Sequence, residues 1–253
     1  MIEIILLSIV QGITEFLPVS STLHLLIFSH LINGYQINLL LVSGMHIGSL
    51  IAILIFFAVD SKLEIKQISY RQIIQIVLVG TLPIIIVGFI LYDFIDRNMH
   101  INSLVIASTF MFGILLFIVD KYSKSKKKLS GLKFFDLIVI GIFQCFALIP
   151  GASRSATTII SSRFLQIDRE ASIIISVLLS FPAMIGAFML ALLKTNVGDF
   201  DSSIILQGIA PSVIFSFLSS YLALKLFYRY SSSNGFGVFA AYRVMLAIFL
   251  LFN

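Results

Sequence analysis

The sequence predicts an all-α protein that crosses a membrane several times and carries two broken helices in its interior. Three observations lead to this prediction. Hydrophobic residues make up 59% of the 253 residues and charged residues only 11%, with a mean hydropathy of +1.08, whereas soluble domains carry about 25% charged residues. Long apolar runs recur along the chain. Two further apolar stretches are each interrupted by a proline and a cluster of hydroxyl side chains, and polar clusters at membrane depth usually mark a working site.

The first broken segment covers residues 1–32, with QGITEFLPVSSTLH at its centre. Pro18 disfavours helical backbone at Leu17, and the hydroxyl residues that follow are good N-caps for a new helix. We therefore expect two half-helices, roughly 1–17 and 21–32, each shorter than the ~20 residues that cross a bilayer. Protein or a water-filled cavity must cover such a break. The competing interpretation is one kinked span whose hydroxyls bond back to the helix.

Six full membrane spans are expected from the long apolar runs. They lie at about residues 38–59, 72–92, 102–119, 171–193, 204–224 and 236–252. The last run contains Arg243, seven residues from its start. We expect the long stem of this arginine to snorkel to the cytoplasmic face, with an internal ion pair as the other interpretation.

Loop charge orients these spans. The loop 121–133 holds six lysines and no acidic residue, so the positive-inside rule places it in the cytoplasm together with 60–71 and 229–235. Residues 95–101 and 194–203 then fall outside. The lysine-rich loop can also bind anionic lipid, and no nucleic-acid partner is expected from charge that is confined to membrane loops.

A second broken segment, residues 134–166, repeats the first. Gln144 aligns with Gln11 and Pro150 with Pro18, with one residue gapped, and three full spans follow each copy. Loop charge gives the two copies opposite orientations, so that the first enters from outside and the second from the cytoplasm. An inverted repeat of this kind places its polar breaks near the midplane of the membrane, at the repeat interface.

The expected fold is therefore a set of six transmembrane helices plus two re-entrant helix hairpins in an inverted-topology repeat. The whole chain, 1–253, is expected to form one integral membrane domain. Its repeats cover about 1–120 and 134–253, and the basic cytoplasmic loop 121–133 joins them.

The polar residues of the two breaks make up a candidate phosphate site. Gln11 and Glu15 are four residues apart and share one helix face. Arg154 lies at the expected start of a helix, where free N–H groups, hydroxyls and a guanidinium suit a phosphate; the competing interpretation is an ordinary loop cation. The candidate residues are Gln11, Glu15, Ser20, Ser21, Thr22, His24, Ser153, Arg154 and Ser155.

The segments QGITEFLPVSSTLH and PGASRSATT resemble the two motifs of the undecaprenyl-diphosphatases, the bacitracin-resistance family. The resemblance covers essentially the whole chain, including its length and the spacing of the motifs. It implies a multi-pass hydrolase of the bacterial cytoplasmic membrane that converts undecaprenyl diphosphate to undecaprenyl phosphate and inorganic phosphate. This reaction recycles the lipid carrier for peptidoglycan and cell-wall synthesis. The resemblance also implies a divalent cation, Mg²⁺ or Ca²⁺, and the same arrangement of spans and hairpins.

Residue by residue, the resemblance also implies roles. The catalytic group would be Glu15, Ser20, Ser21, His24 and Arg154. The substrate phosphates would bind Ser153, Arg154, Ser155 and Thr22, and the cation would bind Glu15 and Gln11. Many members have Glu where this chain has Gln11, which offers a metal a carbonyl oxygen but neither charge nor base. Either Ser21 or Ser20 attacks with activation by His24, or these residues position a metal-bound water.

Transport is the rival function. Inverted repeats with broken helices are also a transporter architecture, in which Glu15 and His24 would relay protons for a phosphorylated lipid or an anion. The clustering of Ser21 and His24 next to Glu15 favours hydrolysis, because anion transport does not need it. The expected partners are a polyprenyl diphosphate lipid and the bilayer, with a homodimer left open and the site expected to open to the outer face.

Three other residues in apolar segments are open to interpretation. His46, between two glycines, either bonds across to another helix or borders the site. Gln144 either lines the pocket or makes a helix-packing hydrogen bond. Cys145, the only cysteine, is expected to be a small buried apolar residue.

Overall fold

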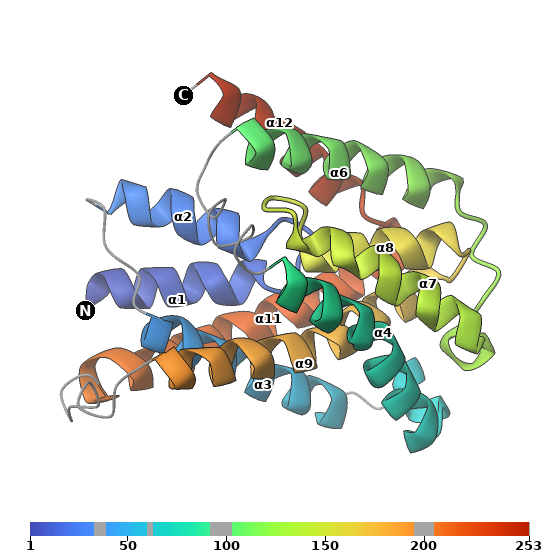
Figure 1. Cartoon of the computed structure of the whole chain (residues 1–253), viewed down its shortest axis with the longest axis horizontal. Helices are drawn as coiled ribbons and strands as arrows, with labels where there is room; N and C mark the ends of the chain where they lie inside the picture. Colours follow the sequence, from blue (N-terminus) through green and yellow to red (C-terminus); the bar gives the residue numbers. More distant parts are fainter. Residues whose placement is uncertain (33–38, 60–62, 92–102, 195–204, 253) are drawn as a thin grey trace.

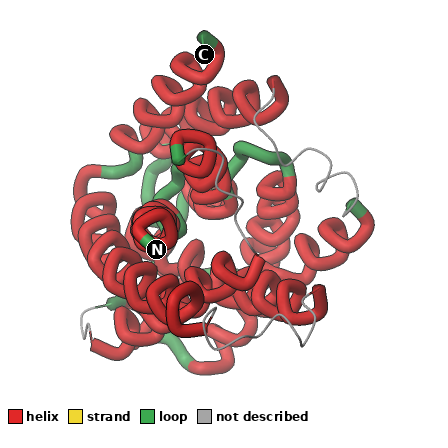
Figure 2. The backbone as a smooth tube through the Cα atoms, turned by 90° about the vertical axis from the view of Figure 1, so that its left-hand side faces the viewer, coloured by secondary structure: helices red, strands yellow, loops and turns green. Residues whose placement is uncertain are grey.

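The computed structural model describes residues 1–32, 39–59, 63–91, 103–194 and 205–252, and these form helices joined by loops, with no strand among them (Figure 2). The α-helices are α1 (Ile2–Thr14), α2 (Ser21–Leu31), α3 (Leu39–Val59), α4 (Tyr70–Ile90), α6 (Ser103–Tyr122), α7 (Phe134–Gln144), α8 (Arg154–Phe164), α9 (Arg169–Lys194), α11 (Ala210–Asn234) and α12 (Gly237–Leu251). Short 3-10 helices are η1 (Glu64–Gln67), η2 (Leu129–Gly131) and η3 (Cys145–Leu148), and a π-helical turn, η5 (Ile205–Ile209), precedes α11.

Five of the described helices, α3, α4, α6, α9 and α11, are long and apolar enough to cross a membrane. This confirms the expected multi-pass, all-α character of the chain. The sixth expected span corresponds to α12, which has 15 residues and is shorter than the ~20 residues typical of a transmembrane helix. The loops that the sequence places outside, 95–101 and 194–203, lie outside the described residues except for Lys194 at the end of α9.

Two helix pairs enter the molecule from opposite ends and turn back in its interior (Figure 1). The α1–α2 pair starts at the end that holds both chain termini, and the α7–α8 pair starts at the other end. The broken-helix interpretation is confirmed for the first segment, where α1 ends at Thr14 and α2 begins at Ser21. The first half-helix therefore ends three residues earlier than expected.

Backbone geometry at the two breaks is closely similar. Ser20 is the N-cap residue of α2 with φ 75°, and Ser153 is the N-cap residue of α8 with φ 72°. Both lie in the left-handed region that non-glycine residues rarely adopt. Gly151 has φ 91°, and a Cβ at this position would overlap the Ser108 hydroxyl and the Val105 carbonyl. The second break thus requires a glycine for two independent reasons.

Small residues let each hairpin pack closely against a long helix. In the first hairpin, Gly12 of α1 accepts a hydrogen bond from Ser220 of α11 at 3.2 Å. In the second, Gly141 of α7 lies against the backbone of α4 at Val79 and Gly80. Small residues at helix interfaces allow such backbone approach in membranes. Gln144 Nε2 donates to Gly80 O at 2.9 Å, so the helix-packing interpretation of this glutamine is confirmed.

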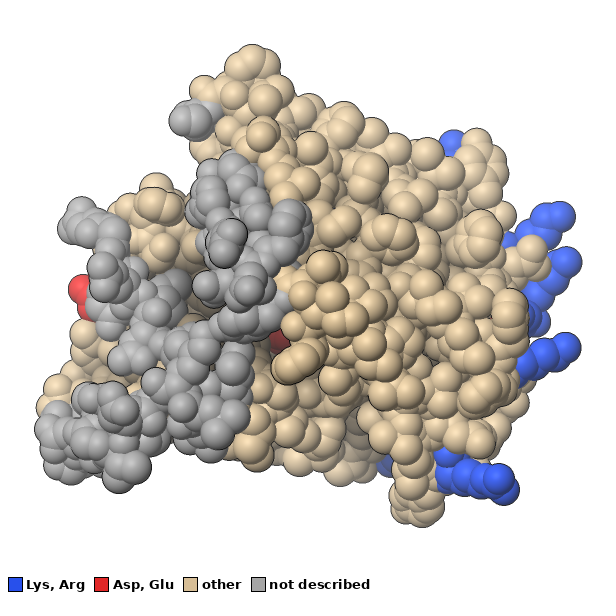
Figure 3. All heavy atoms as spheres, in the orientation of Figure 1, with Lys and Arg blue, Asp and Glu red and all other residues tan. Residues whose placement is uncertain are grey.

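Basic side chains gather at the end of the molecule opposite the termini (Figure 3). At this end, Asp120 of α6 accepts hydrogen bonds from Arg163 Nε at 2.9 Å and Arg169 Nε at 3.0 Å. The backbone N–H of Phe236 donates to the same carboxylate at 3.1 Å. We call this group the Asp120 cluster. It connects α6, α8, α9 and the turn between α11 and α12.

Candidate active site

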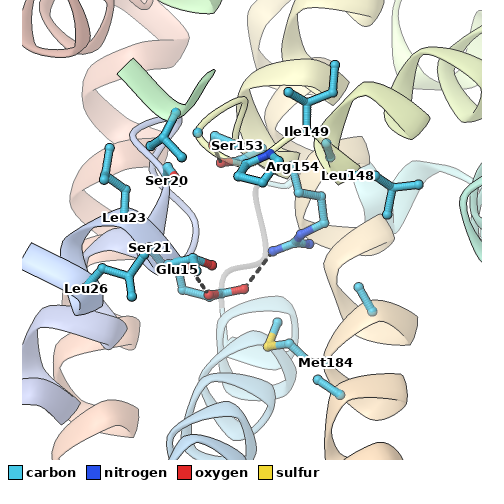
Figure 4. Close-up of a pocket in the computed structure, with 18 of the residues that line it drawn as sticks. Glu15, Ser20, Ser21, Leu23, Leu26, Leu148, Ile149, Ser153, Arg154 and Met184 are labelled. Atoms are coloured by element: carbon cyan, nitrogen blue, oxygen red, sulfur yellow. Dashed lines mark hydrogen bonds and ion pairs between the residues drawn. The ribbon is translucent and has the colours of Figure 1, made fainter. Parts of the chain in front are cut away.

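A pocket of about 290 Å³ lies where the two breaks meet. The first residues of α2 line it from one side and the first residues of α8 from the other. In Figure 4, Glu15, Ser20 and Ser21 lie on one side of the pocket, with Ser153 and Arg154 across from them. Two helix N-termini, whose first N–H groups lack intrahelical partners, therefore converge on one space. This arrangement suits an anion with more than one phosphate.

Glu15 connects the two halves of the pocket through its carboxylate. Its Oε1 accepts a hydrogen bond from Arg154 Nη2 at 2.8 Å, across 139 positions of sequence. Its Oε2 accepts hydrogen bonds from Ser21 Oγ at 2.9 Å and from Gln11 Nε2 at 2.7 Å. Glu15 is buried and Arg154 is nearly so. A buried ion pair of this kind needs such additional hydrogen bonds to offset its desolvation.

Arg154 keeps part of its guanidinium free for a ligand. It is the first residue of α8 and lines the pocket, which rules out an ordinary loop cation. Its Nη1 is buried and has no hydrogen-bond partner in the described part of the chain. A buried donor without a partner is costly. Because Arg154 is a residue of the pocket wall, its guanidinium can offer charge-assisted hydrogen bonds to an anion in the pocket.

The other hydroxyls predicted to bind phosphate, those of Thr22, Ser153 and Ser155, line the pocket, and two of them also make contacts of their own. Ser153 Oγ caps α8 by accepting from Ala156 N at 3.4 Å. Ser155 Oγ donates to Leu17 O at 2.8 Å, so it ties the second break to the first. Ser20 and Thr22 line the pocket. The structure thus brings together eight of the nine predicted residues: Gln11, Glu15, Ser20, Ser21, Thr22, Ser153, Arg154 and Ser155.

His24 is directed elsewhere. Its Nδ1 donates to Ser20 O at 2.7 Å, and its Nε2 lies 2.6 Å from the hydroxyl of Tyr242 on α12. Because a carbonyl can only accept, Nδ1 carries the proton, and the Tyr242 hydroxyl donates to Nε2 in the neutral ring. His24 is absent from the described pocket wall. His46 borders the pocket instead, and its Nδ1 lies 3.5 Å from Gln11 Nε2 on α1, so both of its interpretations are confirmed.

Arg243 corrects the sequence prediction. Its side chain is fully buried at 0% exposure, so it does not snorkel to the membrane surface, and no carboxylate pairs with it in the described residues. Its Nη1 donates to Pro18 O at 3.2 Å, and its Nη2 donates to Gly151 O at 2.8 Å and Ala152 O at 3.0 Å. The guanidinium therefore links the carbonyl groups of both breaks behind the pocket.

Comparison with known proteins agrees with the motifs. Residues 4–249 match the model of a protein family described as bacitracin resistance protein BacA. The chain belongs to this family. An undecaprenyl-diphosphatase of Pelagibacter ubique is 37% identical over 252 residues, covering 98% of this chain and 96% of the relative. One of Alteromonas mediterranea is 37% identical over 266 residues, covering 98% and 97%. Undecaprenyl-diphosphatase 3 of Bacillus cereus is 32% identical over 251 residues, covering 99% and 96%.

Sequence reasoning missed two residues that support the breaks around this BacA-family pocket. Tyr242, the partner of His24, and Ser108, which donates to the carbonyl of Pro150, were not singled out. The adjacent pair Tyr242–Arg243 inside an apolar span was the available signal for the first, because polar residues at membrane depth face the protein interior. No local signal marks Ser108, whose partner is 42 residues away.

The donor atoms beside the pocket fit a divalent cation that takes most of its ligands from the substrate. Gln11 Oε1 is buried without a hydrogen-bond partner in the described residues, and it belongs to a side chain that contacts Glu15. No cluster of three or more His, Cys, Asp or Glu side chains suited to a metal occurs among the described residues. One carboxylate and one amide oxygen are a sparse set, typical of Mg²⁺ sites that are completed by phosphate and water.

Proposed function

We propose that this chain is a membrane-embedded phosphatase that converts undecaprenyl diphosphate to undecaprenyl phosphate and inorganic phosphate. In the bacterial cytoplasmic membrane, this reaction returns the lipid carrier for peptidoglycan synthesis. The observation that carries the proposal is the Glu15 carboxylate, which holds the Ser21 hydroxyl on one oxygen and the Arg154 guanidinium on the other. One carboxylate thus brings together a hydroxyl that can attack phosphorus and a guanidinium that can bind phosphate. The names of the BacA-family relatives agree with it.

Binding of the diphosphate falls to Arg154 and the two helix N-termini. The partnerless Nη1 of Arg154 donates to a phosphoryl oxygen, and the first N–H groups of α2 and α8 donate to others. Charge on these oxygens is spread in the transition state, and fixed donors in a site that excludes water stabilise it most.

Glu15 takes the proton in the chemical step. The Ser21 hydroxyl already donates to Glu15 Oε2 at 2.9 Å, a distance suited to proton transfer. In one route, Ser21 Oγ bonds to the terminal phosphorus while the bridging P–O bond breaks and undecaprenyl phosphate leaves; water then cleaves the phosphoserine. In the other, Ser21 and Glu15 orient a water that attacks directly. Glu15 is the base in both routes, and the neutral ring of His24 positions the start of α2.

Glu15 and Gln11 would hold the divalent cation, Mg²⁺ or Ca²⁺. When bound, such a cation neutralises charge on the phosphoryl oxygens and orients the diphosphate. Gln11 supplies only a neutral oxygen, so the substrate itself provides most of the affinity. Arg154 remains paired with the carboxylate oxygen that does not contact Gln11.

The proposal includes the full membrane arrangement. Six spans and two re-entrant hairpins form one domain from two inverted repeats, about 1–120 and 134–253. The basic end faces the cytoplasm and the pocket opens to the outer face. The opposite entry of the two hairpins (Figure 1) and the charge at one end (Figure 3) support this orientation. A homodimer remains a prediction from the sequence.

Release of phosphate from undecaprenyl diphosphate by the purified protein in detergent tests the proposed function. Wild-type protein with Mg²⁺ should release inorganic phosphate, and Arg154→Ala should release almost none while eluting as the same folded species. A transporter of phosphorylated lipid or of an anion releases no phosphate in detergent. Absence of release from the wild-type protein with both Mg²⁺ and Ca²⁺ would therefore reject hydrolysis in favour of that rival.

A further inference from the structure

An apolar groove of about 420 Å³ lies between α4 and α7 on the outer surface of the helix bundle. Pro83, Val87 and Leu91 of α4 form one wall, and α7 with η3 forms the other, including Cys145 and Phe146. Cys145 is half-buried, which corrects the expectation of a buried residue. Phe146 is 44% exposed. Because these residues belong to the apolar helices of a membrane protein, the groove is open to lipid.

The groove adjoins the catalytic pocket. Leu148 and Ile149 line both spaces. Figure 4 shows these two side chains beside Arg154, on the side of the pocket opposite Leu23 and Leu26. The groove is therefore an apolar surface directly next to the polar pocket, on the side of Arg154.

A second apolar groove, between α1 and α11, provides an internal comparison. It is larger, about 690 Å³. In the repeat predicted from the sequence, its residues Ile9 and Ile13 correspond to Ile142 and Phe146 of the first groove. Yet it shares no described residue with the catalytic pocket. It extends to Tyr230, near the basic end of the molecule.

We propose that the groove between α4 and α7 binds the first isoprene units of the polyprenyl tail, next to the diphosphate. This inference rests on the proposed function, because a lipid diphosphate is the ligand that joins a polar group in the pocket to an apolar chain. The groove is within the roughly 300–1,000 Å³ of small-ligand pockets, so it holds only the start of the chain. The groove walls on α4 lie in the half of that helix away from Tyr70 and the basic end, so the substrate occupies the leaflet on that side.

Substitutions that fill one groove or the other test this assignment. Cys145→Phe and Val87→Phe narrow the groove between α4 and α7, and Leu222→Phe on exposed Leu222 is the matched change in the groove between α1 and α11. Each protein is assayed for phosphate release from farnesyl diphosphate, which has a tail, and from isopentenyl diphosphate, which has almost none. The second substrate also reports whether the pocket of each variant is intact.

Filling the groove should raise the KM for farnesyl diphosphate about tenfold, since each methylene displaced from apolar contact costs about fourfold in affinity. The kcat should change little, because the tail contributes equally to the bound substrate and the transition state. Kinetics with isopentenyl diphosphate should match the wild type. Leu222→Phe should leave both substrates unaffected.

Three results would overturn the assignment. The first is an unchanged KM for farnesyl diphosphate in both Cys145→Phe and Val87→Phe. The second is an equal rise of KM for both substrates in these variants. The third is a rise of KM for farnesyl diphosphate alone in Leu222→Phe. If the wild-type protein releases no phosphate from undecaprenyl diphosphate, the proposed function fails by itself. Calorimetric titration with farnesyl phosphate then decides the groove: Cys145→Phe and Val87→Phe should bind it about tenfold more weakly than Leu222→Phe, and equal affinities would reject it.

Discussion

At the scale of single residues, one carboxylate holds the pocket together. Glu15, directly after α1, contacts a residue of that helix, the hydroxyl at the start of α2 and the guanidinium at the start of α8. Behind it, Arg243 binds three carbonyl groups from both breaks. The carbonyls at each break lack helical partners, and a planar group with several donors satisfies them better than an ammonium group.

Arg243→Lys should fold but lose most of its activity. The lysine keeps the positive charge, but one ammonium group cannot span Pro18 O on one side and Gly151 O on the other. A displacement of about 1 Å at a catalytic group can cost ~10²-fold in rate, so kcat should fall by about that factor. The measurement is phosphate release by protein that elutes as a single folded species. Near-normal kcat in this variant would show that Arg243 does not position the breaks.

Gln11→Glu should lower the cation concentration needed for half-maximal activity. The present amide donates to Glu15 Oε2 at 2.7 Å, and a second carboxylate would replace that contact by repulsion unless a cation lies between them. A metal titration of phosphate release, with Glu15→Gln as the control, measures the change. The control should be nearly inactive at every metal concentration. An unchanged metal requirement in Gln11→Glu would place residue 11 outside the metal's reach.

At the scale of elements, the breaks were predictable and their supports were not. Pro18, Pro150 and the following hydroxyl residues are local signals, and both breaks occur where these signals stand. Arg243 was predicted to snorkel because that prediction uses only the position of a residue in its own helix. Its hydrogen-bond acceptors lie up to 225 positions away in the sequence. His24 was grouped with Ser21 because both belong to the first motif, and a motif cannot reveal that Tyr242 approaches from α12.

The Asp120 cluster is the element-scale feature with the clearest energetic consequence. Asp120→Asn leaves the buried guanidinium of Arg163 without its carboxylate, and breaking a buried ion pair in this way costs about 3–5 kcal/mol. The thermal midpoint in detergent should therefore fall by several degrees. The matched control is Lys128→Ala, which breaks a 3.7 Å pair with Glu64 from a side chain that is 73% exposed. Equal midpoints for the two variants would contradict a stabilising role for the cluster.

At the scale of the whole molecule, the chain places its charge and its termini at opposite ends (Figures 1 and 3). The sequence could predict this because the positive-inside rule assigns each loop to a side of the membrane from the lysines and arginines of that loop alone. It could not predict that each hairpin packs against a helix of the other half, α1 against α11 and α7 against α4. Pairings of this kind depend on glycine and serine contacts between distant segments, such as Gly12 with Ser220.

Labelling with a membrane-impermeant maleimide should distinguish the two ends in intact cells. On a Cys145→Ala background, cysteines in place of Ile2 and Phe252 should react from outside. A cysteine in place of Ser130, next to the lysine-rich segment, should react only after the cells are opened. Ile2 and Phe252 are 67% and 81% exposed, so burial would not explain a lack of reaction. Labelling of the Ser130 position in intact cells would overturn the orientation.

The central claim is that the two broken segments, one from each half of the chain, supply a single phosphoryl site through the contact of Glu15 with Arg154. A double-mutant cycle on kcat/KM for undecaprenyl diphosphate tests it most directly. Glu15→Gln and Arg154→Ala should each lower kcat/KM by about 10²–10³-fold. Because residues that act as a unit are not additive, the double variant should be no slower than the more damaging single one. Losses that multiply in the double variant would show that Glu15 and Arg154 act independently and would contradict the account.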